Sequence, residues 1–285
     1  MSTLTSTTST TRPSLGAGDV GKSYFETDSN KILVWDGAGW NEWNPDLTLG
    51  PGFQNNFTAA LDGTNDFLSI PTSTDFDFGA GDFSFTFWMR ITSRESFGGL
   101  FTRASTYRLK FQGSDSVMNL AMTGGEQAGI ISHGSSLLGA WHHIMIVRSG
   151  SGLTGYVDGS LSASKTLTTQ TMSSTGNALV WGDNLGQAIG GQLDEISIFD
   201  RALSSAERTE IYNNGASFDI ESAYTGADAP LAFYRCGDDD DDTDSGGSSV
   251  DNGDTIGTIK NVVNPGTHDM SQFNGATYSN ANSPV

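Results

Sequence analysis

The segment 83–91 constrains the fold most strongly, because its side chains alternate with a period of two. One set of alternate residues is entirely apolar: Phe83, Phe85, Phe87, Met89 and Ile91. The other set carries three polar or charged side chains and one indole: Ser84, Thr86, Trp88 and Arg90. Residues two apart share a face of a β-strand, whereas a helix repeats every 3.6 residues. The segment therefore predicts a strand of an antiparallel sheet with one buried face.

Other parts of the chain carry shorter strand patterns. These segments are 141–147, 179–181 and 193–199, and residues 155–159 are predicted to form the tip of a hairpin. The composition agrees, with 36 Gly for turns and 16 Phe, 7 Tyr and 6 Trp for strands. One helix is predicted from residue 204, where Ser204 and Glu207 form a capping box and Gly215 ends the helical pattern. The sequence thus predicts an all-β sandwich with one short helix.

The charge of the chain limits its partners. Lys and Arg total 14 against 33 Asp and Glu, which gives a formal net charge of −19. Such a surface repels phosphate backbones, so we expect no nucleic-acid partner. The N-terminal residues resemble no signal peptide, and no apolar stretch approaches the ~20 residues that span a bilayer. Cys236 is the only cysteine, so no internal disulfide forms. We expect synthesis in a host cytoplasm and no membrane insertion.

Four regions are predicted along the chain. Residues 1–12 form a polar tail, and residues 13–50 form a small β-hairpin module whose core is three tryptophans, Trp35, Trp40 and Trp43. Residues 51–220 form the sandwich, and residues 221–285 add strands and an acidic loop that pack on it or extend it. An isolated hairpin is only marginally stable. The Trp-rich module is therefore predicted to anchor the protein to a partner.

Five motifs in order resemble the concanavalin A-like jelly rolls of the laminin-G-like type. They occupy residues 61–68, 82–90, 141–144, 155–159 and 191–207. The resemblance implies an antiparallel jelly-roll β-sandwich. It also implies that Ca²⁺ is held by aspartate side chains and backbone carbonyls, and the positions that resemble such ligands are Asp62, Asn65, Asp66 and Asp194. An alternative is that Asp62 and Asp66 only cap a turn.

The front module resembles a module of structural proteins from marine tailed phages. The matching residues are Arg12-Pro13, Gly18–Gly21, Tyr24–Asp28, Lys31–Trp35, Asp36-Gly37 and Trp40. This resemblance implies a virion protein whose partners are other capsid or tail proteins, and virion positions are symmetric, which favours a homo-oligomer.

Hydrolysis of a glycan requires two carboxyl groups that face one cleft. The acidic strand offers only Asp194 and Glu195, which are adjacent and are predicted to face opposite sides. His142 and His143 are adjacent in the same way. The sequence therefore predicts no catalytic residues and no enzyme. The acidic run 238–242 is predicted to be a solvated loop.

These observations favour a non-enzymatic structural protein on the virion surface of a tailed phage, which decorates a capsid or tail and contacts host surface glycans. Trp88 is predicted to stack on a sugar if it is exposed on the concave face, or to be structural if the C-terminal strands cover it. The alternatives are a receptor-binding fibre tip and a calcium-dependent lectin-like module of a bacterial surface protein. A glycan hydrolase ranks last.

Overall fold

The computed structural model divides the chain into two compact units, residues 1–54 and 55–285. It describes residues 5–7, 14, 23–26, 31–35, 40–43 and 55–280, apart from residues 105, 174–175, 184 and 216. The sequence places the boundary at residue 50, within the same Gly/Pro-rich stretch. Among the described residues no helix is long and apolar enough to cross a membrane.

The first unit is a four-stranded sheet rather than an isolated hairpin. Its strands are β1 (Thr5–Thr7), β2 (Ser23–Glu26), β3 (Lys31–Trp35) and β4 (Trp40–Trp43), in that order across the sheet. The predicted hairpin corresponds to β2 and β3. The polar tail supplies β1, which pairs parallel to β2, and this strand was not predicted because its Ser and Thr residues have no apolar alternation.

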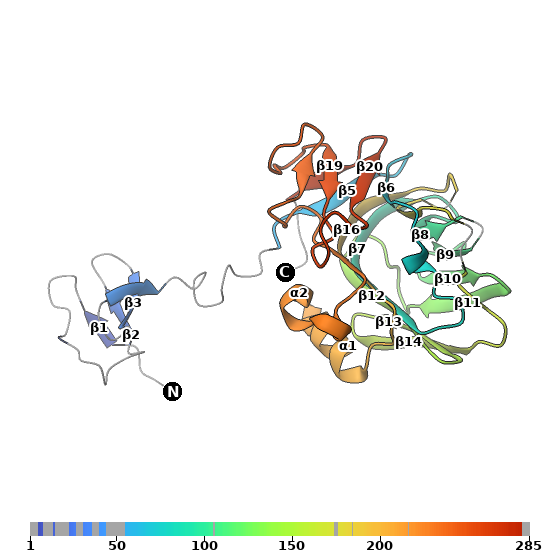
Figure 1. Ribbon diagram of the computed structural model, residues 1–285, viewed down its shortest axis with the longest axis horizontal. Coiled ribbons are helices and arrows are strands. Elements are labelled where there is room, and N and C mark those ends of the chain that lie inside the picture. Colours follow the sequence, from blue (N-terminus) through green and yellow to red (C-terminus); the bar gives the residue numbers. More distant parts are fainter. Residues whose placement is uncertain are drawn as a thin grey trace. The chain divides into compact units, whose positions relative to one another are not determined.

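The second unit is a sandwich of two sheets in which every strand pair is antiparallel, as predicted (Figure 1). The nine-stranded sheet has the order β11-β10-β9-β8-β15-β6-β20-β19-β18. Its strands are β6 (Phe67–Ile70), β8 (Gly99–Arg103), β9 (Tyr107–Phe111), β10 (Val117–Met122), β11 (Gly125–Ser132), β15 (Leu179–Trp181), β18 (Thr243–Asp244), β19 (Ile256–Ile259) and β20 (Met270–Phe273). The sandwich prediction is confirmed.

The second sheet has eight strands, in the order β14-β13-β12-β7-β16-β5-β21, with β17 also paired to β16. Its strands are β5 (Thr58–Asp62), β7 (Phe83–Arg94), β12 (His142–Ser149), β13 (Gly152–Val157), β14 (Ser160–Thr166), β16 (Ile189–Phe199), β17 (Ala232–Tyr234) and β21 (Thr277–Ser279). The C-terminal strands thus join both sheets of the sandwich.

The core lies between the sheets, and β7 faces it as predicted. Its five alternate apolar side chains have no exposed surface. The Phe85 ring stacks on Phe101 of β8, with 4.5 Å between ring centroids and 15° between planes. Offset stacking of this kind adds stability beyond the area buried. These contacts join the two sheets at the centre of the sandwich.

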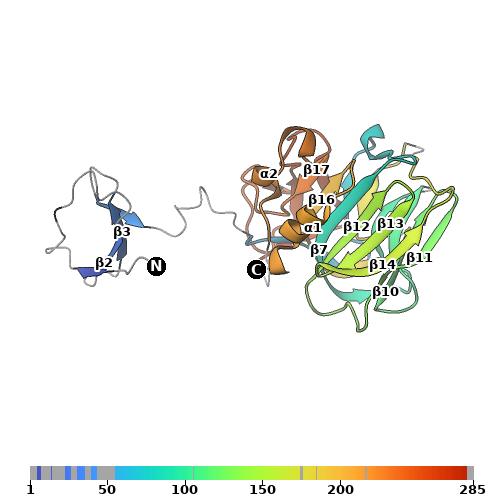
Figure 2. The ribbon, with the colours of Figure 1, turned by 90° about the horizontal axis from the view of Figure 1, so that it is seen from below.

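Part of the opposite face of β7 is also buried: Ser84 bonds to the backbone of Arg201 and Leu203, and the Tyr212 ring lies on Trp88. Helix α1 (Ser205–Tyr212) has the predicted capping box of Ser204 and Glu207. It ends at Asn213, which adopts a left-handed conformation with φ of 45°, rather than at Gly215. A second helix, α2 (Ile220–Ala223), was not predicted. Figure 2 shows α1 beside the sheet that contains β7, β12 and β16.

Candidate functional site

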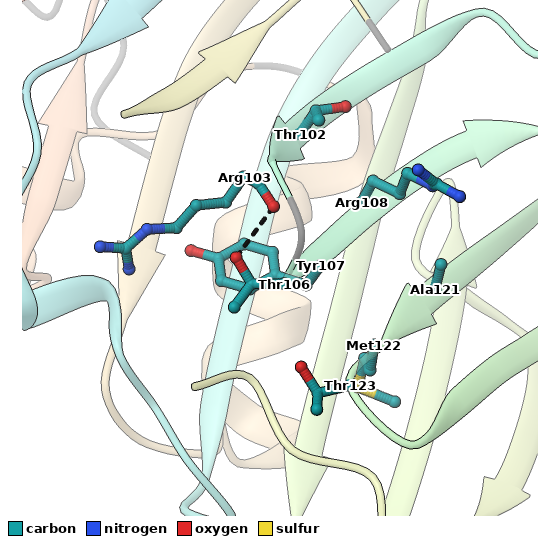
Figure 3. A pocket seen from close by; sticks show the side chains of 8 residues that line it. All are labelled: Thr102, Arg103, Thr106, Tyr107, Arg108, Ala121, Met122 and Thr123. Carbon is teal, nitrogen blue, oxygen red and sulfur yellow. Dashed lines mark hydrogen bonds between the residues drawn. The ribbon is translucent and has the colours of Figure 1, made fainter. Parts of the chain in front are cut away.

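A hollow of about 260 Å³ lies where β8 ends, β9 begins and β10 ends. Strand pairing places Arg108 opposite Thr102 on one side and opposite Ala121 on the other. Because the Ala121 side chain stops at Cβ, space remains beside the Arg108 guanidinium. The side chains that line the hollow are drawn in Figure 3: Thr102, Arg103, Thr106, Tyr107, Arg108, Ala121, Met122 and Thr123.

One side of the hollow is held rigidly by Arg103. Its side chain is 1 % exposed. Its Nη1 donates to Asp77 Oδ1 at 2.8 Å, and its Nε donates to the carbonyl of Asn177 at 3.0 Å. Thr106 Oγ1 donates to the Arg103 carbonyl at 2.9 Å, the bond dashed in Figure 3. The Arg103 guanidinium is therefore held by contacts within the protein and is not available to bind a ligand.

Tyr107 forms the floor beside Arg103. Its hydroxyl donates to the carbonyl of Phe76 at 3.2 Å. Burial raises the pKa of Tyr107 well above its usual range, so the hydroxyl keeps its proton. Tyr107 is therefore uncharged, and its ring packs in the core near Phe85 and Phe101.

Arg108 and Thr102 are different, because each has a buried polar atom with no partner. Arg108 Nε and Thr102 Oγ1 are inaccessible to solvent and make no hydrogen bond within the described part of the chain. Nearby cations are paired: Arg94 lies 2.6 Å from Asp115, and Lys110 lies 3.3 Å from Glu126. A buried donor without a partner costs about 1–3 kcal/mol. Such a donor in a hollow marks a site that a ligand oxygen can complete.

Sequence reasoning did not select these two residues, although a signal was present. Tyr107–Phe111 alternates apolar and basic side chains, which predicts that Arg108 and Lys110 share a face. Which of the two has an acidic neighbour depends on the distant Glu126, and one sequence does not supply that contact. The hollow therefore emerges only from the fold.

The predicted calcium residues do not all meet. Asp62 Oδ1 accepts hydrogen bonds from the backbone N–H groups of Thr64 at 2.7 Å and Asn65 at 3.3 Å. These bonds, that from Thr64 first, lower the pKa of Asp62. Asp66 Oδ2 accepts from the backbone N–H of Asp62 at 3.1 Å, and Asp66 Oδ1 is buried with no hydrogen-bond partner among the residues that the structure describes. Asp62, Asn65 and Asp66 thus share one turn.

Asp194 lies elsewhere. Asp62 pairs with Gly190, four residues before Asp194 on β16, which corresponds to roughly 13 Å along a strand. In the described residues, no group of three acidic, histidine or cysteine side chains is arranged to hold a metal. The four predicted ligands therefore do not form one centre.

A β-bulge changes the expected geometry of Asp194 and Glu195. The register against β7 shifts between Asp194 and Ser197, and Glu195 has a positive φ of 48°. The strict alternation of side chains is interrupted there, and the nearby charge of Asp238 acts to raise the pKa of both carboxyl groups. The prediction that Asp194 and Glu195 face opposite sides is therefore wrong, because it assumed a regular strand.

The two carboxyl groups at the bulge are deeply buried. Asp194 is 0 % and Glu195 4 % exposed, and three of their four oxygens have no hydrogen-bond partner among the described residues. Burial, together with the neighbouring Glu195 charge, raises the pKa of Asp194 well above its usual value. Burial also raises the pKa of Glu195, against the opposing charge of Arg235. Neither group reaches a surface where a substrate binds.

The acidic loop is only partly solvated. Asp242 is 2 % exposed and accepts hydrogen bonds from the backbone N–H groups of Gly237 at 2.7 Å and Lys260 at 2.6 Å. Burial raises the pKa of Asp242 to about 7. The prediction of a solvated loop is therefore corrected for Asp242, which joins two segments of backbone.

Trp88 is covered by α1. It is 4 % exposed. Its ring stacks on Tyr212 with 6.2 Å between ring centroids, and the His143 ring lies against it at a tilt of 50° with 4.8 Å between centroids. This geometry favours the structural interpretation of Trp88 over a sugar-stacking platform. In the first unit, Trp35 is half-buried, and the side chains of Trp40 and Trp43 lie outside the described residues. The anchor therefore stays a prediction.

Comparisons with known proteins agree with the fold. A family model described as the concanavalin A-like lectin/glucanases superfamily matches residues 62–207. A putative carbohydrate binding protein from Bacteroides ovatus is similar in structure, with a TM-score of 0.60 and 13 % identity over 81 % of this chain and 62 % of that one. The chain thus spans less than two thirds of that protein.

Two further solved structures show weaker similarity. The pentraxin from Limulus polyphemus has a TM-score of 0.41 and 18 % identity, over 55 % of this chain and 82 % of that one. The receptor binding domain of a botulinum neurotoxin C/D mosaic has a TM-score of 0.42 and 12 % identity, over 61 % and 48 %. A search of curated proteins finds no match.

Proposed function

Because this chain belongs to the concanavalin A-like lectin/glucanases superfamily, we propose that it binds a glycan without cleaving it. The observation that carries this proposal is the hollow beside Arg108, where two buried polar atoms lack partners. Ligand sites combine apolar lining with a few polar groups that fix orientation. Thr102 and Arg108 supply the polar groups, and Tyr107, Ala121 and Met122 supply the apolar surface.

The size of the hollow supports a single sugar ring. Its volume of about 260 Å³ lies just below the ~300–1,000 Å³ of sites that enclose drug-sized molecules. One terminal or protruding ring of a glycan therefore suits it better than a long oligosaccharide. The Bacteroides ovatus protein, described as a putative carbohydrate binding protein, is consistent with this proposal.

A non-catalytic role follows from the position of the acids. Glycoside hydrolysis uses two carboxyl groups on either side of the scissile bond. Asp194 and Glu195 belong to β16 in the eight-stranded sheet, whereas the hollow belongs to the nine-stranded sheet. The lining of the hollow contains no carboxyl group. The site therefore has binding groups and lacks a general acid.

We further propose that the protein is a surface component of a tailed-phage virion and that it is anchored through residues 13–50. The resemblance of residues 12–40 to a module of phage structural proteins supports this role. Symmetric virion positions favour a homo-oligomer with capsid or tail partners. A receptor-binding fibre tip and a calcium-dependent lectin-like module of a bacterial surface protein are the alternatives.

Glycan binding and anchoring in a particle can be tested separately with a chain that lacks residues 1–54. We expect this truncation to stay folded, because the second unit has its own core. It should bind a printed glycan panel like the full chain and release no reducing sugar from any glycan. It should no longer incorporate into particles. Normal incorporation would remove the anchor from the proposal, and loss of glycan binding from both chains after Ala121→Leu would support the hollow as the site.

Calcium is proposed only for the turn of Asp62, Asn65 and Asp66, with backbone carbonyls and water as further ligands. The buried, unpartnered Asp66 Oδ1 supports a cation there. Added Ca²⁺ should raise the melting temperature by a few degrees, and a chelator should reverse the rise. Asp66→Asn should abolish the response, and Asp194→Asn should keep it. An unchanged melting temperature in the native chain would leave the turn-capping interpretation.

A further inference from the structure

Arg108 is unusual among the arginines of this acidic protein. Every other arginine in residues 55–280 has a hydrogen bond, an ion pair or another polar contact: Arg90, Arg94, Arg103, Arg148, Arg201, Arg208 and Arg235. Arg108 has none with any residue that the structure describes, although the sequence carries 33 acidic residues. A half-buried cation without a counter-ion is costly, since burial weakens its hydration. The molecule thus holds a guanidinium ready for an external anion.

The nearest carboxylate in the same row of the sheet is already engaged. Strand pairing runs from Thr102 through Arg108 and Ala121 to Glu126. Glu126 contacts Lys110 at 3.3 Å and accepts a hydrogen bond from the Asn119 side chain. Ala121 lies between Glu126 and Arg108 and supplies no charge. The carboxylate that would otherwise neutralise Arg108 is therefore held on the neighbouring lysine.

The unpartnered atom of Arg108 is informative, because Nε forms one side of the planar donor fork. Arginine binds a carboxylate with two parallel N–H bonds, and this fork matches the two oxygens of a carboxylate. Arg108 Nε is buried and faces no acceptor among the described residues. Thr102 Oγ1, also unpartnered, lies on the adjacent strand and can bond a ring hydroxyl. Figure 3 shows Arg108 between Thr102 and Ala121 and directed away from Arg103.

We propose that the hollow recognises an acidic sugar, a ring that carries a carboxylate, and that Arg108 binds this carboxylate while Thr102 bonds a hydroxyl of the same ring. The proposal rests on the glycan-binding function proposed above and names its ligand class. The overall charge of −19 repels polyanions at long range. Recognition is therefore local, and it suits one acidic ring in a largely neutral glycan.

The test uses the full chain and a glycan panel built as matched pairs, in which each pair differs only by a C6 carboxylate in place of a C6 hydroxymethyl group. We expect at least one acidic member to bind roughly tenfold or more tightly than its neutral twin, since hydrogen bonds to charged groups are stronger than neutral ones. Arg108→Gln should erase this difference. Lys165→Gln, on β14 of the other sheet, removes the same charge and should preserve it.

Two more variants test the geometry. Arg108→Lys keeps the charge but loses the fork, so most of the preference for the acidic ring should disappear. Thr102→Val removes a hydroxyl that has no hydrogen-bond partner in the described part of the chain, so the melting temperature should stay unchanged or rise while affinity falls. A fall in both quantities would mean that Thr102 is structural, which overturns its assigned contact.

Failure of the acidic-sugar inference can be distinguished from failure of the proposed glycan-binding function. If acidic and neutral twins bind equally and Ala121→Leu blocks both, the glycan function stands and the acidic-sugar inference is overturned. If 6-sulfated rings bind more tightly than the carboxylate rings, the carboxylate assignment is wrong. If no member of the panel binds, the proposed glycan function itself fails. Thermal unfolding of each variant confirms that lost binding does not reflect a lost fold.

Discussion

Phe85→Ala is expected to lower the free energy of unfolding by about 3–5 kcal/mol, because removal of a buried ring leaves a cavity in the core. Phe85 has no exposed surface. Its ring stacks on Phe101, and its centroid lies 6.2 Å from that of Tyr107 and 6.4 Å from that of Trp181. Chemical denaturation of the full chain, followed by tryptophan fluorescence, measures the change.

Leu161→Ala is the matched control for this substitution. Leu161 is 61 % exposed on the edge strand β14, so its truncation should change stability by less than about 1 kcal/mol. A loss below about 1 kcal/mol for Phe85→Ala would contradict the assigned facing of β7. Equal losses of unfolding free energy for the two variants would show that the measured transition does not report unfolding of the packed sandwich.

Glu195→Gln should stabilise the protein at pH 8 and have little effect near pH 5. Burial raises the pKa of Glu195 in the folded protein, so folding favours its protonated form. Stability from this group is complete below the pKa of the unfolded chain and falls as pH rises toward the folded pKa. Glutamine mimics the protonated acid at every pH. We expect the free energy of unfolding to rise at pH 8 and to change little near pH 5, measured by denaturation at both pH values.

Glu207→Gln provides the opposite control. Burial acts to raise the pKa of Glu207, but hydrogen bonds from Ser204 and Arg201 outweigh it and lower the pKa. Its contribution is therefore present above the pKa of the unfolded chain and is lost as pH falls through the folded pKa. Glu207→Gln should destabilise the protein at pH 8. If both glutamate variants shift stability in the same direction at pH 8, the burial of Glu195 does not govern its titration.

The core was predictable where local pattern and tertiary contact agree. Phe83–Ile91 alternates so regularly that its buried face follows from the sequence, and the Ser204–Glu207 box marks the start of α1 for reasons that are local to the backbone. Both features depend on residues within one strand or one helical turn. The sandwich and its helix were therefore predicted correctly.

The candidate site was harder to predict, because it depends on contacts between distant residues. The bulge at Glu195 breaks an alternation that the sequence alone shows as intact. The unpaired state of Arg108 follows from the engagement of Glu126 with Lys110 across two strands. The sequence allows Trp88 to be a sugar-stacking residue, but in the fold the Tyr212 ring stacks on it. In each case the sequence shows the type of side chain, but it does not show which distant side chains contact it.

The interleaving of first and last strands has a consequence for folding during synthesis. Strand β5, which begins the sandwich, pairs with β21 near its end, and β6 pairs with β20. Pairings between such distant residues make folding slow, because a long loop must close before they form. The edges of β5 and β6 therefore stay open until the ribosome has made nearly the whole chain. During that interval the nascent protein presents unpaired backbone that a chaperone or a neighbouring nascent chain can bind.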